Sequence, residues 1–575
     1  MLTAAQRTRL VLAIMVFLMI AAALWARLLW LQVLQPDHWV SIARRQHVQV
    51  LELPPLRGSI LDRNRKPLAL SLRLTSLFAD PRHIKEAGSL ARCLSPLLDK
   101  PEGKLRAELS RKKRGFVWLA RKIPNQTAAR IRSMRLPGVH GVMETQRFYP
   151  HGYLAGQVIG FAGMDGQGLE GLEMTCDRIL KGEPGWRWLA RDARLRSVGA
   201  WETATVPPRD GLEVVLTLDT TIQYIAERAL EEGCKKSRAK AACIVVSDPA
   251  TGEILALANR PSYDPNRFAK VTPDQRRNRA VTDAFEPGSV FKVVTAAVAL
   301  GTGTVKPEDT FDCEHGSATL AGRILHDDQP HGVLTFREVI SQSSNIGVAK
   351  AAMKVGANPL YQGIRAFGFG DPTGVDLPGE VGGTLRPPSQ WSKPTITTIP
   401  MGHEVAVNAM QLTQMISVVA NGGFLMRPWI IREIRDPSSG ALVKSFKPKR
   451  VRRVVTPETA AELQRILSMV VQTGTGKQAQ VAGFQAAGKT GTAQKLEPNG
   501  QYSHSKFTAS FIGFIPAGRP RLSIVVVMDE PHFPYYGGTV AAPVFKRVAA
   551  DTLAYLGYQG RVVVARNETG AVGGD

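Results

Sequence analysis

The sequence predicts an α+β fold built on an antiparallel sheet with helices on both sides, together with an N-terminal α+β module and one transmembrane helix. Three observations predict it. Apolar, β-branched runs of strand length occur in pairs around tight turns, and runs with the 3.6-residue period of helices lie near them. One long apolar segment without a charge stands near the N-terminus.

Length and charge limit the classes of protein. The chain has 575 residues, too many for a single core, so two or more domains are expected. It carries 73 Lys and Arg against 49 Asp and Glu, a net charge of +24, which favours anionic partners. The basic runs 111–114 and 448–453 are short and are expected to be solvated surface. Because no groove-reading motif is visible, we expect no nucleic-acid partner.

The N-terminus predicts a membrane anchor. Arg7 and Arg9 precede an uncharged apolar run at 10–26, Arg27 interrupts it, and apolar residues resume at 28–34. A side chain such as arginine can extend toward the membrane surface, so the whole segment is long enough to span a bilayer.

A cleaved signal peptide is the alternative, with Ala21, Ala22 and Ala23 as the cleavage site. Because the apolar run continues past that site, we expect an uncleaved anchor at 10–34 with residues 1–9 as a cytoplasmic stub. The long remainder then lies outside the cytoplasm. We divide it into an N-terminal module at 37–209, a catalytic domain at 210–560 and a flexible tail at 561–575.

The catalytic domain opens with a strand and a helix. A strand is predicted at 212–219, followed by a helix at 220–236 with apolar residues at helical spacing. Thr220 or Thr221 is expected to cap this helix, and Gly233 lies near its expected end.

Two hairpins are predicted in the same domain. Residues 242–258 form two apolar strands around a turn at 249–252, and strands at 507–516 and 522–530 flank a second turn. Hairpins imply antiparallel pairing, which is the basis for the predicted sheet.

Cysteines and histidines do not predict a metal site. The five cysteines are widely spaced, their number is odd, and no Cys-x-x-Cys occurs, so no disulfide framework can be derived. Four potential ligands stand in the stretch 311–332, but their spacing matches no zinc template, and we expect a polar loop there. They are Cys313, His315, His326 and His331.

A serine and a lysine stand three residues apart at the start of an apolar run. Ser289 follows Pro-Gly, and Lys292 lies within the apolar stretch 290–300, which predicts a buried helix. Residues i and i+3 share a helix face, so the hydroxyl and the amine are expected to be neighbours. A lysine without hydration has a lowered pKa, and its neutral amine can activate a hydroxyl as a nucleophile.

The pattern Ser-x-x-Lys alone carries little weight. It recurs at Ser110, Ser237 and Ser503, where a capping serine and a solvated lysine are the simpler interpretation. The burial expected around Ser289 sets it apart. A second segment, Ser343-Ser344-Asn345, precedes another apolar helix, although serine and asparagine also cap helices routinely.

A third segment, 483–494, allows two interpretations. Residues 483–490 match the phosphate-binding pattern G-x-x-x-x-G-K-[ST], which requires a strand before it and a helix after it. The flanking sequence favours neither a strand before residue 483 nor a helix after residue 490. We therefore predict a strand at 488–495, a turn at Asn499-Gly500 and a second strand from Phe507. In such a strand Lys489 and Gly491 face one side. Thr490 and Thr492 face the other.

The three segments together resemble the penicillin-recognising serine acyltransferases. Their Ser-x-x-Lys, Ser-x-Asn and Lys-Thr-Gly elements correspond to residues 289–292, 343–345 and 489–491. Three N-terminal stretches resemble the N-terminal module and junction of class B penicillin-binding proteins, which implies an elongated, pedestal- or dimerisation-type module at 37–209. They are 57-RGSILDRN-64, 147-RFYPHGYLAGQVIG-160 with 168-GLEGLE-173, and 216-LTLDTTIQ-223.

Two further stretches refine the resemblance. Residues 528–545 are similar to the septal, division-specific transpeptidases. One departure is 64-NRKPLA-69, where the family usually has Asn-Gly and this chain has Asn64-Arg65. It lies in a turn of the N-terminal module and does not affect the catalytic interpretation.

The resemblance implies roles for eight residues. Ser289 attacks the penultimate D-alanine carbonyl of a peptidoglycan stem peptide, and neutral Lys292 accepts its proton. Ser343 relays a proton to the leaving amine. The other implied roles are that Asn345 holds Lys292 and the substrate amide, Lys489 supplies positive charge, Thr490 and Thr492 bind the terminal carboxylate, and Gly491 completes the binding strand.

The resemblance also implies a setting and partners. It implies an enzyme of the inner membrane with a periplasmic catalytic domain, which needs no metal or other cofactor, is inhibited by β-lactams, and contacts a membrane glycosyltransferase and division proteins. Four alternatives stay open at this point: an elongation-type transpeptidase, a D,D-carboxypeptidase or β-lactam hydrolase of the same superfamily, a non-catalytic wall-binding scaffold, and a phosphate-loop nucleotide enzyme.

Overall fold

The computed structural model describes residues 3–35, 48–190, 205–497 and 499–560. The chain forms two compact units, one from residues 1–56 with 182–210 and the other from residues 57–181 with 211–575. The predicted tail at 561–575 lies outside the described residues, as do the first residues of the module predicted to start at 37.

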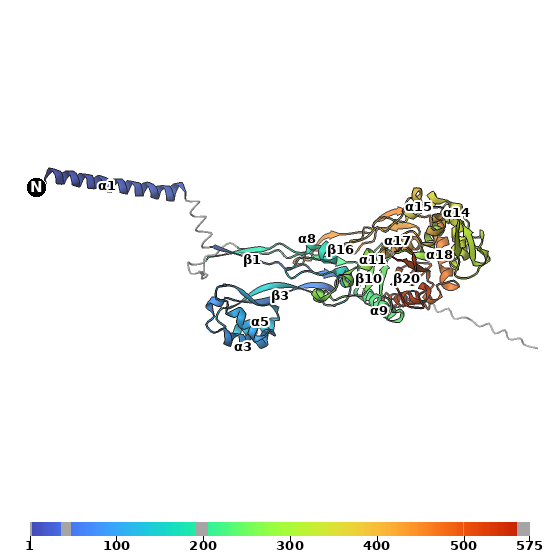
Figure 1. The fold of residues 1–575 in the computed structure, drawn as a ribbon, viewed down its shortest axis with the longest axis horizontal. Coiled ribbons are helices and arrows are strands. Elements are labelled where there is room, and N and C mark those ends of the chain that lie inside the picture. Colours follow the sequence, from blue (N-terminus) through green and yellow to red (C-terminus); the bar gives the residue numbers. More distant parts are fainter. Residues whose placement is uncertain (1–2, 36–47, 191–204, 498, 561–575) are drawn as a thin grey trace, which may run out of the picture. The chain divides into compact units, whose positions relative to one another are not determined.

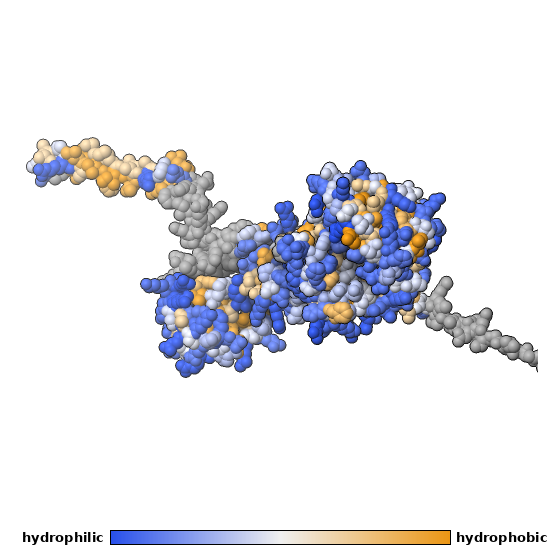
Figure 2. Space-filling model, turned by 45° about the vertical axis from the view of Figure 1, so that its right-hand side comes forward, coloured by the Kyte–Doolittle hydropathy of each residue, from blue (hydrophilic) through white to orange (hydrophobic). Residues whose placement is uncertain are grey.

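The first unit contains the predicted anchor. Helix α1 (Ala4–Leu29) continues into a short π-helical turn, η1 (Trp30–Leu34), and together they are long and apolar enough to cross a membrane. No residue of α1 is buried by protein, and its side chains are apolar over most of its length, as Figure 2 shows. The helix starts at Ala4, earlier than the predicted residue 10, because 4-AAQRTR-9 contains no helix breaker.

The first unit also contains a small antiparallel sheet, in which β6 lies between β1 and β7. Its strands are β1 (Val48–Leu53), β6 (Gly185–Ala190) and β7 (Thr205–Val206).

The second unit begins with a sheet organised around the long strand β3 (Pro67–Ala79), which pairs antiparallel with both β4 and β5. Three helices cover a small apolar core against these strands. The elements are β4 (Val117–Ile123), β5 (Val139–Phe148), α3 (Ala87–Leu98), α4 (Glu102–Leu109) and α5 (Asn125–Ser133).

This sheet extends into the catalytic domain. Strand β2 (Ile60–Leu61) pairs with β3 on one side and, in parallel, with β8 (Glu213–Leu216) on the other. Strand β8 then pairs with β16 (Ile431–Arg435), and β16 with β17 (Leu442–Ser445). Backbone hydrogen bonds therefore run continuously between the two parts of this unit; β3 and β16, which belong to this sheet, are labelled in Figure 1.

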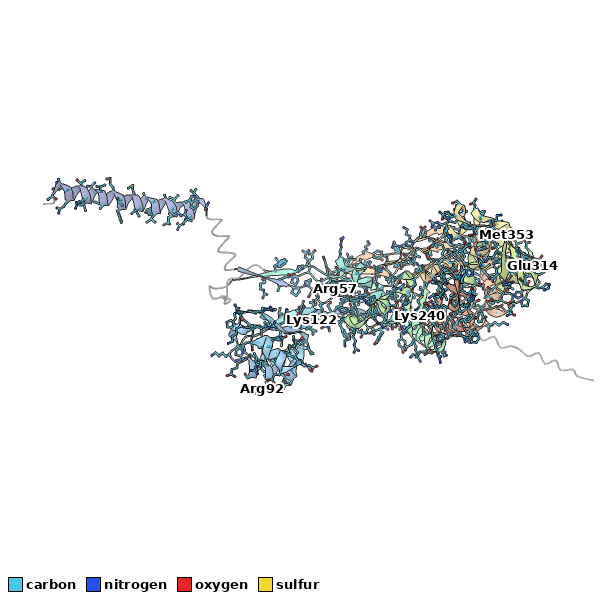
Figure 3. The ribbon with its side chains drawn as sticks, viewed as in Figure 1. Arg57, Arg92, Lys122, Lys240, Glu314 and Met353 are labelled. Atoms are coloured by element: carbon cyan, nitrogen blue, oxygen red, sulfur yellow. The ribbon has the colours of Figure 1, made fainter. Side chains whose placement is uncertain are left out.

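A buried ion-pair network joins the N-terminal stretches that the sequence singled out. Arg57, labelled in Figure 3, donates to Glu173 and to Asp177, each at 2.6 Å, and Arg147 donates to the other oxygen of Glu173 at 2.6 Å. Glu173 is fully buried, so its charge requires these partners. Charge pairing thus joins the stretch that begins at Arg57 to the stretch 147–160 with 168–173.

The departure at 64–66 has a structural consequence. Arg65 takes the left-handed conformation, with φ at +62°, where glycine carries no steric penalty and arginine does. Asp62 holds this turn, because its side chain accepts from the backbone N–H groups of Asn64 and Lys66, each at 2.8 Å. The turn therefore keeps its shape without glycine.

The catalytic domain is built on a five-stranded sheet, every neighbouring pair of which is antiparallel, in the order β10-β9-β21-β20-β19. This confirms the predicted sheet and both predicted hairpins. The strands are β9 (Ala241–Ser247), β10 (Ile254–Arg260), β19 (Ala487–Leu496), β20 (Tyr502–Ile515) and β21 (Leu522–Asp529).

Helices pack on both faces of the sheet, as predicted. On one face, α9 (Thr220–Ser237) and α20 (Ala542–Tyr555) share an apolar core with alternate strand residues such as Ile244 and Val526. The opposite strand residues, such as Val245 and Val525, join the larger core. The helices of that core are α12 (Lys292–Gly301), α13 (Phe336–Ser341), α14 (Asn345–Val355), α15 (Ala357–Ala366), α17 (Ala409–Ala420) and α18 (Pro457–Gln472).

The predicted cap of α9 is wrong by one residue. Asp219 caps the helix, because its carboxylate accepts from the N–H groups of Thr221 and Ile222. The helix also continues past Gly233 to Ser237, since Gly233 packs closely against Val544 of α20. Packing thus overrides the tendency of glycine to end a helix.

Candidate active site

The predicted nucleophile lies in a tight turn before a buried helix. Ser289 is part of a 3₁₀ turn, η4 (Gly288–Phe291), and α12 begins at Lys292, so the predicted helix starts with a 3₁₀ turn. Ser289 is half-buried, whereas Val290 and Phe291 are fully buried. The turn therefore holds one hydroxyl at the edge of a packed core.

The backbone of Gly402 packs against this turn and bonds to it. The Gly288 N–H donates to the Gly402 carbonyl at 3.2 Å, and Gly288 itself has φ at +59°. A Cβ on Gly402 would lie 2.3 Å from the Gly288 carbonyl oxygen. Only a residue without a side chain lets the two backbones approach this closely.

Lys292 is fully buried, and its ammonium nitrogen has three acceptors. It donates to the Ser343 carbonyl at 2.5 Å, to Ser343 Oγ at 3.1 Å and to Asn345 Oδ1 at 2.7 Å. Burial lowers the pKa of Lys292 to about 8, although the carboxylates of Asp327 and Asp328 act in the opposite direction. This is the direction that the sequence predicted.

The segment 343–345 forms the start of α14. Ser344 is its N-cap and accepts from the Gly347 N–H at 2.9 Å, so the capping interpretation holds for this residue. Ser343 precedes it in the left-handed conformation, with φ at +64°. This uncommon conformation accompanies the placement of both its carbonyl and its hydroxyl on Lys292.

The side chain of Lys489 extends from β19, an edge strand of the sheet, to the hydroxyl of Ser343. It is fully buried, and its nitrogen donates to Ser343 Oγ at 2.9 Å and to the Thr490 carbonyl at 3.2 Å. Burial and the neighbouring charge of Lys292 lower the pKa of Lys489 well below its usual range. Ser343 Oγ therefore lies between two buried amines.

Gly491 lets β19 lie against the nucleophile turn. A Cβ on Gly491 would lie 2.6 Å from Ser510 Oγ, 2.9 Å from a methyl carbon of Val290 and 3.0 Å from the Pro287 carbonyl oxygen. Lys489 and Gly491 thus face the core together, as the strand alternation predicted.

The two threonines bond on the other side of the strand. The Thr490 hydroxyl lies 2.8 Å from that of Thr475, and the Thr492 hydroxyl accepts from the Gly537 N–H at 3.0 Å. Thr490 is buried, whereas Thr492 is partly exposed. Thr475 and Gly537 were not predicted, because no local pattern links them to this strand.

The phosphate-loop alternative is wrong. Lys489 and Thr490 lie inside β19, and the chain continues as a strand to Leu496 with no helix opening after the glycine. The phosphate loop needs a helix N-terminus at that point. The strand and turn predicted instead are confirmed, although β20 begins at Tyr502, before the predicted Phe507.

The four potential metal ligands at 313–331 form no cluster. Among the described residues, no group of three or more His, Cys, Asp and Glu side chains is placed to hold a metal ion. Cys313 is buried, and its sulfur lies 3.2 Å from the Ser344 hydroxyl oxygen. The stretch therefore contacts the site through Cys313 and through Asp327, which the sequence did not single out.

Two protein families match long segments of the chain. Residues 242–550 match the family described as "Penicillin binding protein transpeptidase domain", and residues 52–216 match the "Penicillin-binding Protein dimerisation domain". The chain belongs to the class B penicillin-binding proteins.

Relatives span nearly the whole of this penicillin-binding protein. It is 34% identical to the stage V sporulation protein D of Bacillus subtilis, over 96% of this chain and 87% of the relative. It is 32% identical to the peptidoglycan D,D-transpeptidase FtsI of Escherichia coli, over 93% of this chain and 90% of the relative. A solved structure of penicillin-binding protein 3 from Mycobacterium tuberculosis, complexed with aztreonam, superposes with a TM-score of 0.70 at 30% identity, covering 89% of this chain and 98% of that one.

Proposed function

We propose that this penicillin-binding protein cross-links peptidoglycan stem peptides as a serine D,D-transpeptidase, through an acyl-enzyme on Ser289. One observation carries the proposal. Ser343 Oγ lies between the buried amines of Lys292 and Lys489, and the strand that bears Lys489 packs against the Ser289 turn. These contacts support a site in which a hydroxyl, a buried base and a proton relay come from three distant segments.

In the acylation step, Ser289 Oγ forms a bond to the carbonyl carbon of the penultimate D-alanine. The neutral amine of Lys292 takes the serine proton, and base assistance of this kind contributes roughly 10²–10⁴ in rate. The bond between the two D-alanines breaks, and Ser343 passes a proton from Lys292 to the leaving amine. Terminal D-alanine departs, and the rest of the peptide stays on Ser289 as an ester.

The other predicted residues bind and orient the substrate. Asn345, already bonded to Lys292, orients the substrate amide, and the cationic form of the lysine pair attracts the terminal carboxylate. Thr490 and Thr492 bind that carboxylate. The backbone N–H groups of Ser289 and Thr492 stabilise the oxyanion, where loss of one donor costs on the order of 10²–10³ in rate.

The second half-reaction decides between a transpeptidase and a hydrolase of the same superfamily. In a transpeptidase, an amine from a neighbouring stem peptide attacks the ester and forms the cross-link. The matched N-terminal module and the apolar helix α1 support the transpeptidase, since a freely diffusing hydrolase needs neither.

We further propose a single-pass protein of the inner membrane that works at the division septum with a membrane glycosyltransferase and other division proteins. The C-terminal stretch 528–545, which is similar to the septal transpeptidases, supports this role over one in elongation. In this arrangement residues 10–34 span the membrane, 37–209 form the pedestal and 210–560 catalyse. Depletion in cells is expected to give filaments, whereas round cells would indicate elongation.

Mass spectrometry of the penicillin adduct tests the nucleophile. The full-length protein is labelled with fluorescent penicillin, and the adduct is expected on the peptide that contains Ser289. Ser289→Ala abolishes it, while Ser110→Ala, in an exposed copy of the same Ser-x-x-Lys pattern, keeps it. An adduct that survives Ser289→Ala overturns the nucleophile, complete absence of labelling favours a scaffold, and rapid release of hydrolysed penicillin favours a hydrolase.

A further inference from the structure

A small hairpin packs against the N-terminus of the helix that carries the Ser-Ser-Asn segment. Strands β12 (Ser317–Leu320) and β13 (Arg323–His326) pair antiparallel, and the chain then passes the start of α14. Lys350 of α14 also pairs with Glu314, just before the hairpin, at 2.6 Å. Figure 3 labels Glu314 and Met353 of α14 at the same end of the domain.

Asp327 is the main contact between the hairpin and the helix. Its carboxylate accepts from Ser344 Oγ at 2.6 Å, from the Asn345 N–H at 2.5 Å and from the Ile346 N–H at 3.0 Å. The adjacent His326 carbonyl accepts from the Asn345 side chain at 2.7 Å. A carboxylate here satisfies free N–H groups of the helix and complements its dipole.

Within the part of the chain that the structure describes, the segment held by Asp327 supplies all three hydrogen-bond acceptors of the Lys292 amine. Those acceptors are the carbonyl and hydroxyl of Ser343 and the side-chain oxygen of Asn345. Ser343 has φ at +64°, a conformation that persists only when its surroundings fix it. Asp327 bonds the next three residues and is thus placed to fix it.

We propose that Asp327 is a positioning residue for acylation, whose carboxylate holds the 343–345 turn in the geometry that presents its oxygens to Lys292. It acts through these residues and does not touch the substrate. The inference rests on the proposed acylation of Ser289 and extends it, since none of the three sequence motifs contains this residue.

Asp327 has a second, electrostatic effect that can be measured separately. The charged groups that face the Lys292 amine are Lys489 from β19 and the carboxylates of Asp327 and Asp328. Both carboxylates favour the protonated lysine, but Asp328 is exposed and its side chain makes no hydrogen bond among the described residues. Asp328 therefore offers a matched change of charge without the positioning contacts.

The experiment measures the rate of acylation by fluorescent penicillin against pH, with the full-length protein and with active sites titrated. Asp327→Ala is expected to lower the plateau rate by about 10- to 100-fold, a part of the rate that base assistance contributes. Asp327→Asn keeps one acceptor oxygen, so its plateau rate should fall less than that of Asp327→Ala. Because it removes the negative charge that favours protonated Lys292, the rise in rate should move to lower pH. Asp328→Asn moves the rise in the same direction and leaves the plateau unchanged.

The outcomes separate this inference from the proposed function. If the wild type is acylated on Ser289 and Asp327→Ala keeps a plateau within about twofold, the positioning role is wrong while the function stands. An equal plateau loss in Asp328→Asn also overturns it. If the wild type is not acylated at all, the proposed function fails. If Asp327→Ala does not fold, Asp327→Asn is the deciding variant. An acylation plateau and a pH profile of Asp327→Asn that both match the wild type would overturn the positioning role.

Discussion

Lys292 and Lys489 donate to the same oxygen atom, since Ser343 Oγ lies 3.1 Å from the amine of Lys292 and 2.9 Å from that of Lys489. Both lysines are fully buried, and a second positive charge in this space is strongly disfavoured. The protons of two amines this close are lost in steps that belong to the pair. The pair therefore does not hold two full charges at once, and the neutral form of Lys292 that the proposed mechanism requires becomes available as the pH rises toward 8.

Acylation is expected to speed up as pH rises toward 8. Burial lowers the pKa of Lys292 to about 8, and the neutral amine that accepts the serine proton exists above that pKa. Below it, the second-order rate of penicillin labelling should fall by about tenfold per pH unit, and above it the rate should level off. Stopped-flow labelling across the pH range checks this, and a flat profile contradicts a titrating lysine base.

Gly491→Ala should nearly abolish acylation. The added Cβ would lie within 3.0 Å of Ser510, Val290 and Pro287, so β19 must move away from the nucleophile turn. Misplacement by about an ångström costs on the order of 10²-fold in rate. The measurement is the labelling rate with the melting temperature beside it.

Gly518→Ala is the matched control for that change. Gly518 lies in the turn between β20 and β21, and a Cβ there meets nothing within 4 Å. It should label at the wild-type rate. Equal rates for the two alanine variants would show that strand and turn need not be in contact.

The elements that could be predicted from the sequence are those fixed by local patterns. The hairpin that carries Lys489 follows from alternating residues and the Asn499-Gly500 turn, both of which act over a few residues. The burial of Lys292 follows from the apolar residues around it. These are the cases where local preference and the final packing agree.

The parts that could not be predicted depend on contacts between distant segments. Asp327 bonds a helix start 17 to 19 residues further on, and Thr475 meets Thr490 across 15 residues, with no periodicity to mark either pair. The left-handed conformation of Ser343 is likewise not encoded by a glycine. Such features are set by the tertiary structure around the site.

Thr492→Val should weaken substrate binding more than Thr490→Val. Both hydroxyls are proposed to bind the terminal carboxylate, but Thr490 is buried against Thr475, whereas Thr492 is partly exposed. Loss of a hydrogen bond to a charged group costs about 1.5–3 kcal/mol, or about 10- to 150-fold in kcat/KM toward a D-Ala-D-Ala ester. A larger loss for Thr490→Val would reverse the assignment.

The buried lysine pair should make stability depend on pH in a way that its removal abolishes. Burial lowers the pKa of Lys292 to about 8, below that of a lysine in the unfolded chain. Between these two pKa values the unfolded chain binds more protons, so the free energy of unfolding should rise with pH from about 8 to about 10.4. The cost of holding a charged Lys292 is fully present below pH 8 and disappears above that window.

The double variant Lys292→Met/Lys489→Met removes both amines and therefore this dependence. Relative to the double variant, the wild type should gain at least about 3 kcal/mol across that window, because the Lys292 shift alone implies that much and the lowered pKa of Lys489 adds to it. Urea unfolding followed by tryptophan fluorescence at several pH values measures the difference. Lys235→Met is the control, since Lys235 is exposed on α9 and the pH dependence should match the wild type. Parallel curves for the wild type and the double variant would mean that the amines keep their ordinary pKa values, and the neutral base on which acylation depends would be lost with them.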